Sequence, residues 1–338
     1  MERQTMNSSG SSHYFPMCLS NGTDSMMIDW TGSIASGTRS LKEVPLFWYK
    51  YDRRCAKRDN LYPIIRTGFC MYADGDEVYK GKTDQEFLHD KGIVQTHMRC
   101  EGFDIKLETF LTADHALVER FTILKTPKSK CAFEFFIMTP DAIPTFYLPV
   151  MYLPWSMIDS LAKAGPEKRL GIRSEFLKSK DKGVLECRYQ LPVSNKTRTR
   201  STLSGTILMC CDHKRANAQV NASVGRADTM GSLGSSRLWV DGIRAGDSFT
   251  RRTIIIDARD AAAHRAAAYK TARRPYASLR GAHLAEWEAY AARSKVNIPT
   301  GNLGRIYNAG LYNIRGNVTV ESGMLTLGSM PWLWAAGA

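Results

Sequence analysis

Hydrophobic and polar residues alternate with a period of two in many short segments of the first 256 residues, a pattern typical of half-buried β-strands. In segment 103–111, Phe, Ile, Leu, Thr and Leu occupy every second position, with Asp104, Lys106 and Glu108 among the residues between them. Short turns separate most of these segments, which predicts antiparallel pairing because parallel strands need a long crossover. The expected strands are 46–49, 93–98, 103–112, 117–124, 131–138, 184–192, 206–211, 219–224, 237–240 and 248–256.

The β region is expected to begin where polar residues give way to apolar ones. Residues 1–13 are polar and rich in serine, so we expect a disordered tail there. From Tyr14 apolar residues lie on both sides of Asn21 and Gly22, a dipeptide typical of tight turns, and predict two strands or one bulged strand. With many short strands and few helices, residues 14–256 are expected to form one large two-sheet sandwich.

The spacing of apolar residues changes to that of helices after Asp257. Residues 257–282 are rich in alanine, which favours helix, and Pro275 divides them. In the next residues Leu284, Trp287 and Ala291 recur on one helical face. We therefore expect a helical connector over 257–295.

A second helical unit follows a clear break. Pro299 and Gly301 end the connector, and Asn302 is a suitable N-cap for a new helix. The expected apolar face of this helix consists of Leu303, Ile306, Tyr307, Gly310, Leu311 and Ile314, and Gly316 ends it.

Composition and charge limit the classes of function. A chain of 338 residues with 43% hydrophobic residues can bury a large core and has room for about two domains. The net charge is +13, and residues 251–280 hold eight Arg or Lys against two Asp, a net +6. This segment lacks interleaved aromatic residues and any known nucleic-acid module, so we do not expect nucleic acid as a partner.

The sequence predicts a cytoplasmic protein with reduced thiols. Residues 1–20 contain no apolar core of the length that a secretory signal needs. The longest apolar passage, 142–158, contains three prolines and is shorter than the roughly 20 residues of a membrane-spanning helix. We therefore expect no insertion into a membrane. The eight cysteines form no C-x-x-C pair, so we expect no disulfide framework.

No catalytic, metal-binding or cofactor-binding residue can be nominated from motifs. The seven histidines are dispersed, and Cys211-Asp212-His213 lacks the second half of a zinc site. Neither a Walker loop nor a dinucleotide-binding fingerprint is present. Glu286 and Glu288 belong to the connector, and Asp24 and Asp29 have the positions of turn caps. We therefore predict no metal and no cofactor.

Two stretches of sequence resemble a known family. They are PMCLSNGTDSMMIDWTGSI near the start, and HLAEWEAYAARSKVNIP followed by YNAGLYNIRGN and GMLTLGSMPWLW near the end. Their order resembles that of the six-hairpin glycosidases, among them the maltose, trehalose and kojibiose phosphorylases and their hydrolase relatives. The resemblance implies a mainly β fold: a large antiparallel two-sheet super-sandwich followed by connector helices and the first helix of an incomplete (α/α)6 barrel.

The resemblance also implies where the chemistry lies. In such enzymes the catalytic carboxylates are on barrel loops well beyond the first barrel helix. Residues 296–338 would then be the start of a truncated catalytic barrel, so we nominate no catalytic residue. The implied activity is glycosidic bond cleavage, by inverting hydrolysis or by phosphorolysis, in a longer parent enzyme, and the 338-residue chain alone is expected to be inactive.

Four residues after the second break are candidates for sugar binding. Trp332 and Trp334 either stack on a pyranose or pack in the barrel wall, and Arg315 and Asn317 either bond sugar hydroxyls or serve the end of the helix. The substrate would be an oligosaccharide or glycoside. Without barrel neighbours, the apolar face of helix 302–316 docks on the sandwich or stays exposed, and an exposed face would favour a homodimer.

A different class of function stays open: a stand-alone carbohydrate-binding or interaction module without catalysis. The sequence does not distinguish the sugar, the linkage, or water from phosphate as the attacking group.

Overall fold

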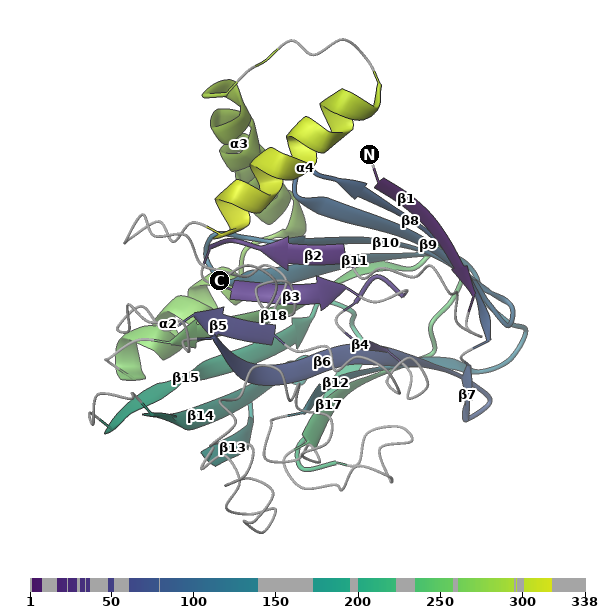
Figure 1. The fold of residues 1–338 in the computed structure, drawn as a ribbon. Helices are drawn as coiled ribbons and strands as arrows, with labels where there is room; N and C mark the ends of the chain where they lie inside the picture. The colour runs from purple at the N-terminus through teal and green to yellow at the C-terminus, as the bar shows by residue number, and fades with distance from the viewer. Residues whose placement is uncertain are drawn as a thin grey trace, which may run out of the picture.

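Two antiparallel sheets of nine strands each make up most of the chain in the computed structural model (Figure 1). The structure describes residues 2–7, 17–22, 24–28, 31–33, 35–36, 48–51, 61–78, 80–138, 173–194, 200–222, 235–257, 261–294, 296 and 301–317. The first sheet contains, in spatial order, β1 (Glu2–Asn7), β8 (Gly81–Leu88), β9 (Ile93–Cys100), β10 (Phe103–Leu111), β11 (Ala116–Lys125), β18 (Ser248–Asp257), β15 (Arg200–Cys211), β14 (Val184–Ser194) and β13 (Arg173–Lys178).

The second sheet has β6 at its centre. Its spatial order is β16 (Ala216–Gln219), β17 (Ser235–Asp241), β12 (Cys131–Met138), β6 (Leu61–Ala73), β5 (Trp48–Tyr51), β3 (Asp24–Ile28) and β2 (Met17–Ser20), and β4 (Ala35–Ser36) and β7 (Asp76–Val78) also pair with β6. The short β4 pairs in parallel, and the other pairings described are antiparallel.

Phenylalanines from both sheets form the centre of the core. Phe121 and Phe249 come from the first sheet, and Phe69, Phe133 and Phe135 from the second. The rings of Phe69 and Phe121 meet edge to face with centroids 5.1 Å apart, and those of Phe121 and Phe135 lie 5.3 Å apart. The sheets therefore pack face to face, as expected for a sandwich.

A fully buried ion pair lies within this core. Arg251 in β18 faces Glu119 in β11, and both side chains are 0% exposed. Ser33 joins them, because its hydroxyl donates to Glu119 Oε1 at 2.8 Å and accepts from Arg251 at 2.9 Å. Buried charges of this kind are tolerated only when paired and hydrogen-bonded.

Three helices follow the strands: α2 (Ala261–Ala272), α3 (Tyr276–Ala292) and α4 (Asn302–Asn317). Pro275 has an extended backbone and precedes α3, so it separates α2 from α3 as predicted. Helices α2 and α3 cover an apolar part of the outer face of the first sheet, with Ala268 and Leu279 at the centre of that contact. None of the described helices is long and apolar enough to cross a membrane.

Helix α4 docks on α3 and β2 through aromatic and polar contacts. Tyr312 stacks on Trp287 with ring centroids 5.0 Å apart, and its hydroxyl oxygen accepts the Ser20 amide at 3.0 Å. The Ser20 hydroxyl donates to the Gly316 carbonyl at 2.6 Å. Helices α3 and α4 lie at one end of the molecule, and β2 lies below α4 (Figure 1).

The mainly β class and the helices at the end of the chain are confirmed, with three differences in detail. Residues 2–7, expected to be disordered, form edge strand β1, because their backbone pairs with β8 over its whole length. Strands β4, β6 to β8 and β13 were not predicted, and β16 ends at Gln219, where a strand was expected to begin. The seven cysteines within the described residues are buried free thiols.

Candidate functional site

The outer face of the first sheet is divided into an apolar and a polar half. Toward one end its side chains are apolar, among them Ile93, Phe110 and Val118, and they pack under α2 and α3. Farther along the same strands the outward positions are polar and uncovered by these helices. Alternation places Lys106, Glu108 and Phe110 on this same outer face, and the division arises because the residue type changes from charged to apolar along the strand.

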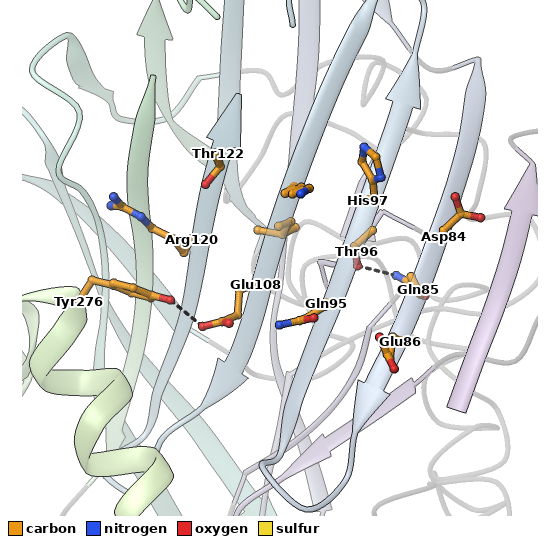
Figure 2. Close-up of a pocket in the computed structure, with 12 residues that line it drawn as sticks. Asp84, Gln85, Glu86, Gln95, Thr96, His97, Glu108, Arg120, Thr122 and Tyr276 are labelled. Carbon is orange, nitrogen blue, oxygen red and sulfur yellow. Dashed lines mark hydrogen bonds between the residues drawn. The ribbon is translucent and has the colours of Figure 1, made fainter. Parts of the chain in front are cut away.

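The uncovered half forms a pocket of about 680 Å³, which we call the polar groove. It is lined by Asp84, Gln85, Glu86, Gln95, Thr96, His97, Lys106, Leu107, Glu108, Arg120, Thr122 and Tyr276. Figure 2 shows the polar side chains in rows across β8 to β11, with Tyr276 entering from the first turn of α3. This volume suits a small ligand.

Glu108 is a groove carboxylate that hydrogen bonds from α3 hold in place. It accepts hydrogen bonds from the Tyr276 hydroxyl at 2.6 Å and from Arg280 Nε at 2.8 Å. Burial alone would raise the pKa of Glu108, but the bonds from Arg280 and Tyr276 outweigh burial and hold this pKa below its usual value. Burial and the Glu108 carboxylate raise the pKa of Tyr276. Glu108 is therefore ionised at neutral pH and Tyr276 remains a donor.

A second network lies toward β8. Arg99 donates to Asp84 at 3.0 Å and to His97 Nδ1 at 3.1 Å. Because a guanidinium only donates, His97 Nδ1 accepts, and His97 Nε2–H donates to Asp104 at 2.6 Å. Both nitrogens of His97 are thus occupied in the neutral imidazole.

The groove has the chemistry of a binding surface for neutral polar molecules. Three carboxylates and two cations line it, and Asp84 and Glu108 are bonded to further arginines. This near balance differs from the +13 charge of the whole chain and offers no net attraction for a polyanion. A general acid of glycoside cleavage needs a raised pKa, so the lowered pKa of Glu108 argues against that role.

Metal binding finds no support in the part of the chain that the structure describes. Within those residues, no group of three or more His, Cys, Asp or Glu side chains is placed to hold a metal ion.

Of the residues proposed from sequence for sugar binding, Arg315 lies outside the lining of the groove. Arg315 lies on α4, with its guanidinium 4.6 Å from the Trp287 ring centroid and 5.0 Å from that of Tyr290. It also forms an ion pair with Glu286. Asn317 is the last residue of α4. Trp332 and Trp334 lie outside the described residues.

The groove was missed from sequence although part of its signal was visible. The alternation that predicted β10 placed Asp104, Lys106 and Glu108 on one face. The sequence did not indicate that α3 would cover only the part of that face around Phe110, leaving these polar side chains together with those of β8 and β9.

Comparison with known proteins gives similarity of structure only. No protein-family model and no curated protein matches the chain. A family GH92 alpha-mannosidase from Bacteroides thetaiotaomicron is 11% identical, with a TM-score of 0.46 over 88% of this chain and 38% of that one. A family GH92 inverting mannosidase from Bacteroides thetaiotaomicron VPI-5482 is 11% identical, with a TM-score of 0.45 over 92% of this chain and 37% of that one.

A bacterial glucoamylase in complex with acarbose is also similar. It is 9% identical, with a TM-score of 0.46 over 94% of this chain and 44% of the glucoamylase chain. The chain thus spans from 37% to 44% of the length of these three structures.

Proposed function

We propose that the chain is the N-terminal portion of a carbohydrate-active enzyme that cleaves glycosidic bonds by inverting hydrolysis or phosphorolysis. In this proposal the sandwich supports a catalytic barrel whose first helix is α4. The observation that carries it is the exposed apolar face of α4, combined with the sequence resemblance of the segments around it.

The apolar face of α4 is open where a further layer of helices would pack. Leu303 is 71% exposed, Ile306 67% and Ile314 53%, although all three are large apolar side chains on one amphipathic helix. Burying each would contribute roughly 1.5–3 kcal/mol. The opposite side of α4 is already occupied by the contacts of Tyr312 with Trp287 and Ser20. A second helical layer would therefore cover a face that the sandwich leaves open.

The buried glutamates of the described strands favour the view that the catalytic centre lies elsewhere in the parent enzyme. Four glutamates with little or no exposure are each bonded to an arginine. These pairs are Glu108 with Arg280, Glu119 with Arg251, Glu134 with Arg237 and Glu186 with Arg265. Against the effect of burial, hydrogen bonds from their arginine partners hold the pKa values of Glu108 and Glu186 below the usual value, whereas the general acid of glycoside cleavage must carry a proton. We accordingly place the acid and base in sequence that follows the first barrel helix.

The proposal is tested by the activity of the product of the extended reading frame. This protein should release sugar from disaccharides or aryl glycosides, and dependence on inorganic phosphate would distinguish phosphorolysis from hydrolysis. The 338-residue chain, assayed in parallel, should be inactive and serves as the control. Absence of cleavage of every glycoside tested, with and without phosphate, would contradict the proposal.

A second candidate function, a carbohydrate-binding module, is favoured by the polar groove. Its balanced charge and its amide, hydroxyl and carboxylate groups suit a neutral polyhydroxylated ligand. Titration of the 338-residue chain with neutral oligosaccharides should then give saturable binding that Gln95→Ala weakens. Lys125→Ala, at the exposed end of β11, is the matched control. Binding unaffected by Gln95→Ala would remove the groove from consideration.

A further inference from the structure

A buried carboxylate and a histidine meet where two turns converge at the end of the sandwich. Asp24, in β3 just after the turn at Asn21 and Gly22, is 0% exposed. Its Oδ2 atom is bonded to His115 Nδ1 and accepts a hydrogen bond from Asn21 Nδ2 at 3.1 Å. His115 belongs to the turn between β10 and β11, 91 residues away in sequence. The contact orients the imidazole ring.

The contact with Asp24 also fixes the role of each ring nitrogen. A carboxylate only accepts, so Nδ1–H donates and Nε2 of the neutral imidazole becomes an acceptor. No side chain or backbone group of the described residues bonds to Nε2, and the His115 side chain is 21% exposed. His97 differs, because Asp104 and Arg99 occupy both of its nitrogens.

The turn that carries His115 is held from several sides. Its backbone is left-handed, with φ 64°, a conformation that non-glycine residues seldom adopt. The His115 amide donates to the Thr112 carbonyl at 3.2 Å, and the His115 carbonyl accepts the Ile255 amide at 3.2 Å. The neighbouring Asp114 accepts a hydrogen bond from Arg274 at 2.8 Å. The imidazole is thus positioned before any ligand arrives.

The same place is connected to the end of α4. The Ser20 hydroxyl donates to the Gly316 carbonyl at 2.6 Å and lies 3.0 Å from the Asp24 carbonyl oxygen. The end of α4 therefore lies beside the turn that leads into β3 and Asp24.

We propose that His115 is a sugar-binding residue whose Nε2 accepts a hydrogen bond from a hydroxyl group of a neutral saccharide, with Asp24 as its positioning residue. This inference rests on the proposed function and deepens it, because it names a ligand contact within the sandwich. A histidine that only fastened the two turns would need Nδ1 alone. The left-handed turn, the hydrogen bond from Nδ1 to Asp24 and the open Nε2 are together the arrangement of an oriented hydrogen-bond acceptor.

The first test is the protonation state of His115 in the ligand-free 338-residue chain. Long-range ¹H–¹⁵N spectra of ¹⁵N-histidine-labelled protein at neutral pH should show the Nδ1–H form, and the His115→Gln variant assigns the signals. Asp24→Asn should shift the population toward the Nε2–H form. A charged imidazolium, or Nε2–H in the wild-type protein, would overturn the proposal because neither can accept a hydrogen bond at Nε2.

The second test is binding, with maltose, trehalose and methyl α-mannoside as probes. At least one of them should shift the His115 Nε2 signal in a saturable way, and His115→Gln should weaken the affinity about three- to tenfold, the value of one hydrogen bond. His213→Gln is the matched control, since His213 also lies in a turn and pairs with Asp247. Absence of any His115 shift with all three probes would overturn the inference.

The outcomes separate this inference from the proposed function. If the extended protein cleaves glycosides but His115→Gln leaves its KM and kcat unchanged, the inference fails and the proposed function stands. If the extended protein cleaves nothing while a sugar shifts His115, the proposed function fails and the contact stands.

Discussion

The buried pair of Glu119 and Arg251 gives the sharpest prediction about stability. Arg251→Met keeps an unbranched side chain against Phe135, whose ring centroid lies 5.1 Å from the guanidinium carbon. The change removes the charged partner of Glu119 and leaves Ser33 as a hydrogen-bond donor to that carboxylate. Both side chains are 0% exposed, so water does not replace the lost contacts. We expect Arg251→Met to lower the free energy of unfolding by about 3–5 kcal/mol.

A double-mutant cycle tests the reasoning behind this magnitude. Glu119→Leu should cost a similar amount, because it leaves Arg251 buried without its counterion. The double variant removes both charges and should be at least about 3 kcal/mol less destabilised than the sum of the two single changes. Urea unfolding monitored by circular dichroism at neutral pH measures all three values.

The control for this cycle is the exposed pair of Arg99 and Asp84, whose side chains are 46% and 42% exposed. Arg99→Met should change the free energy of unfolding by less than about 1 kcal/mol. The reasoning is refuted if Arg251→Met costs no more than Arg99→Met, or if the effects of Arg251→Met and Glu119→Leu simply add.

Three further predictions concern the helices. Burial lowers the pKa of His283 from 6.5 to about 4. Between these two pH values the unfolded chain binds a proton at this residue that the folded chain does not bind. The contribution of His283 to the free energy of unfolding should therefore be full above about pH 6.5 and should fall as the pH drops toward 4. His283→Phe should flatten part of the fall in urea midpoint between pH 7 and 5, because burial also lowers the pKa values of His89 and His213; an unchanged slope would contradict this. Trp287→Ala should cost about 3–5 kcal/mol in thermal unfolding, because it removes the ring between Tyr312 and the core; a cost below about 1 kcal/mol would show that α4 does not depend on that ring. We expect the exposed apolar face of α4 to make the 338-residue chain associate in sedimentation velocity, and Leu303→Ser with Ile306→Ser should reduce this association; a monomeric wild-type chain, or unchanged association of the variant, would contradict the expectation.

The contrast between β10, which was predicted, and β8, which was missed, lies in their buried positions. In β10 the inward Ile105 and Leu107 alternate with charged residues, and the period of two is plain. In β8 the inward positions include Thr83 and Gln85, which are 0% and 2% exposed, so the alternation disappears. Gln85 is acceptable there because its amide donates to Thr96 in β9 at 3.1 Å. That partner is visible only once the pairing register is known.

The helices show a similar limit. The period of apolar residues correctly placed a helix from Asn302, yet Leu303 and Ile306 on its apolar face are exposed, while Tyr312 is buried. The reason lies in α3, which offers the Trp287 ring to Tyr312 and to Arg315. A helical pattern indicates that a face is apolar, but the docking side depends on what the neighbouring element presents.

Sites assembled from distant residues were the least predictable. Asp24 was read as a turn cap, and its backbone amide donates a hydrogen bond to Asn21 Oδ1 at 2.7 Å, as such a turn requires. The carboxylate of Asp24 reaches His115, and only the three-dimensional meeting of β3 with the turn before β11 brings these two residues together.

The measurement that tests the central claim most directly is the sequence of the encoding DNA beyond the codon for Ala338, in the same frame. The account predicts an open frame of several hundred further codons that encodes amphipathic helical hairpins with acidic residues in the loops between them. These hairpins would cover the face formed by Leu303, Ile306 and Ile314 and would supply the missing acid and base. A stop codon directly after Ala338 in an intact gene would contradict the account and leave the binding module as the function to pursue.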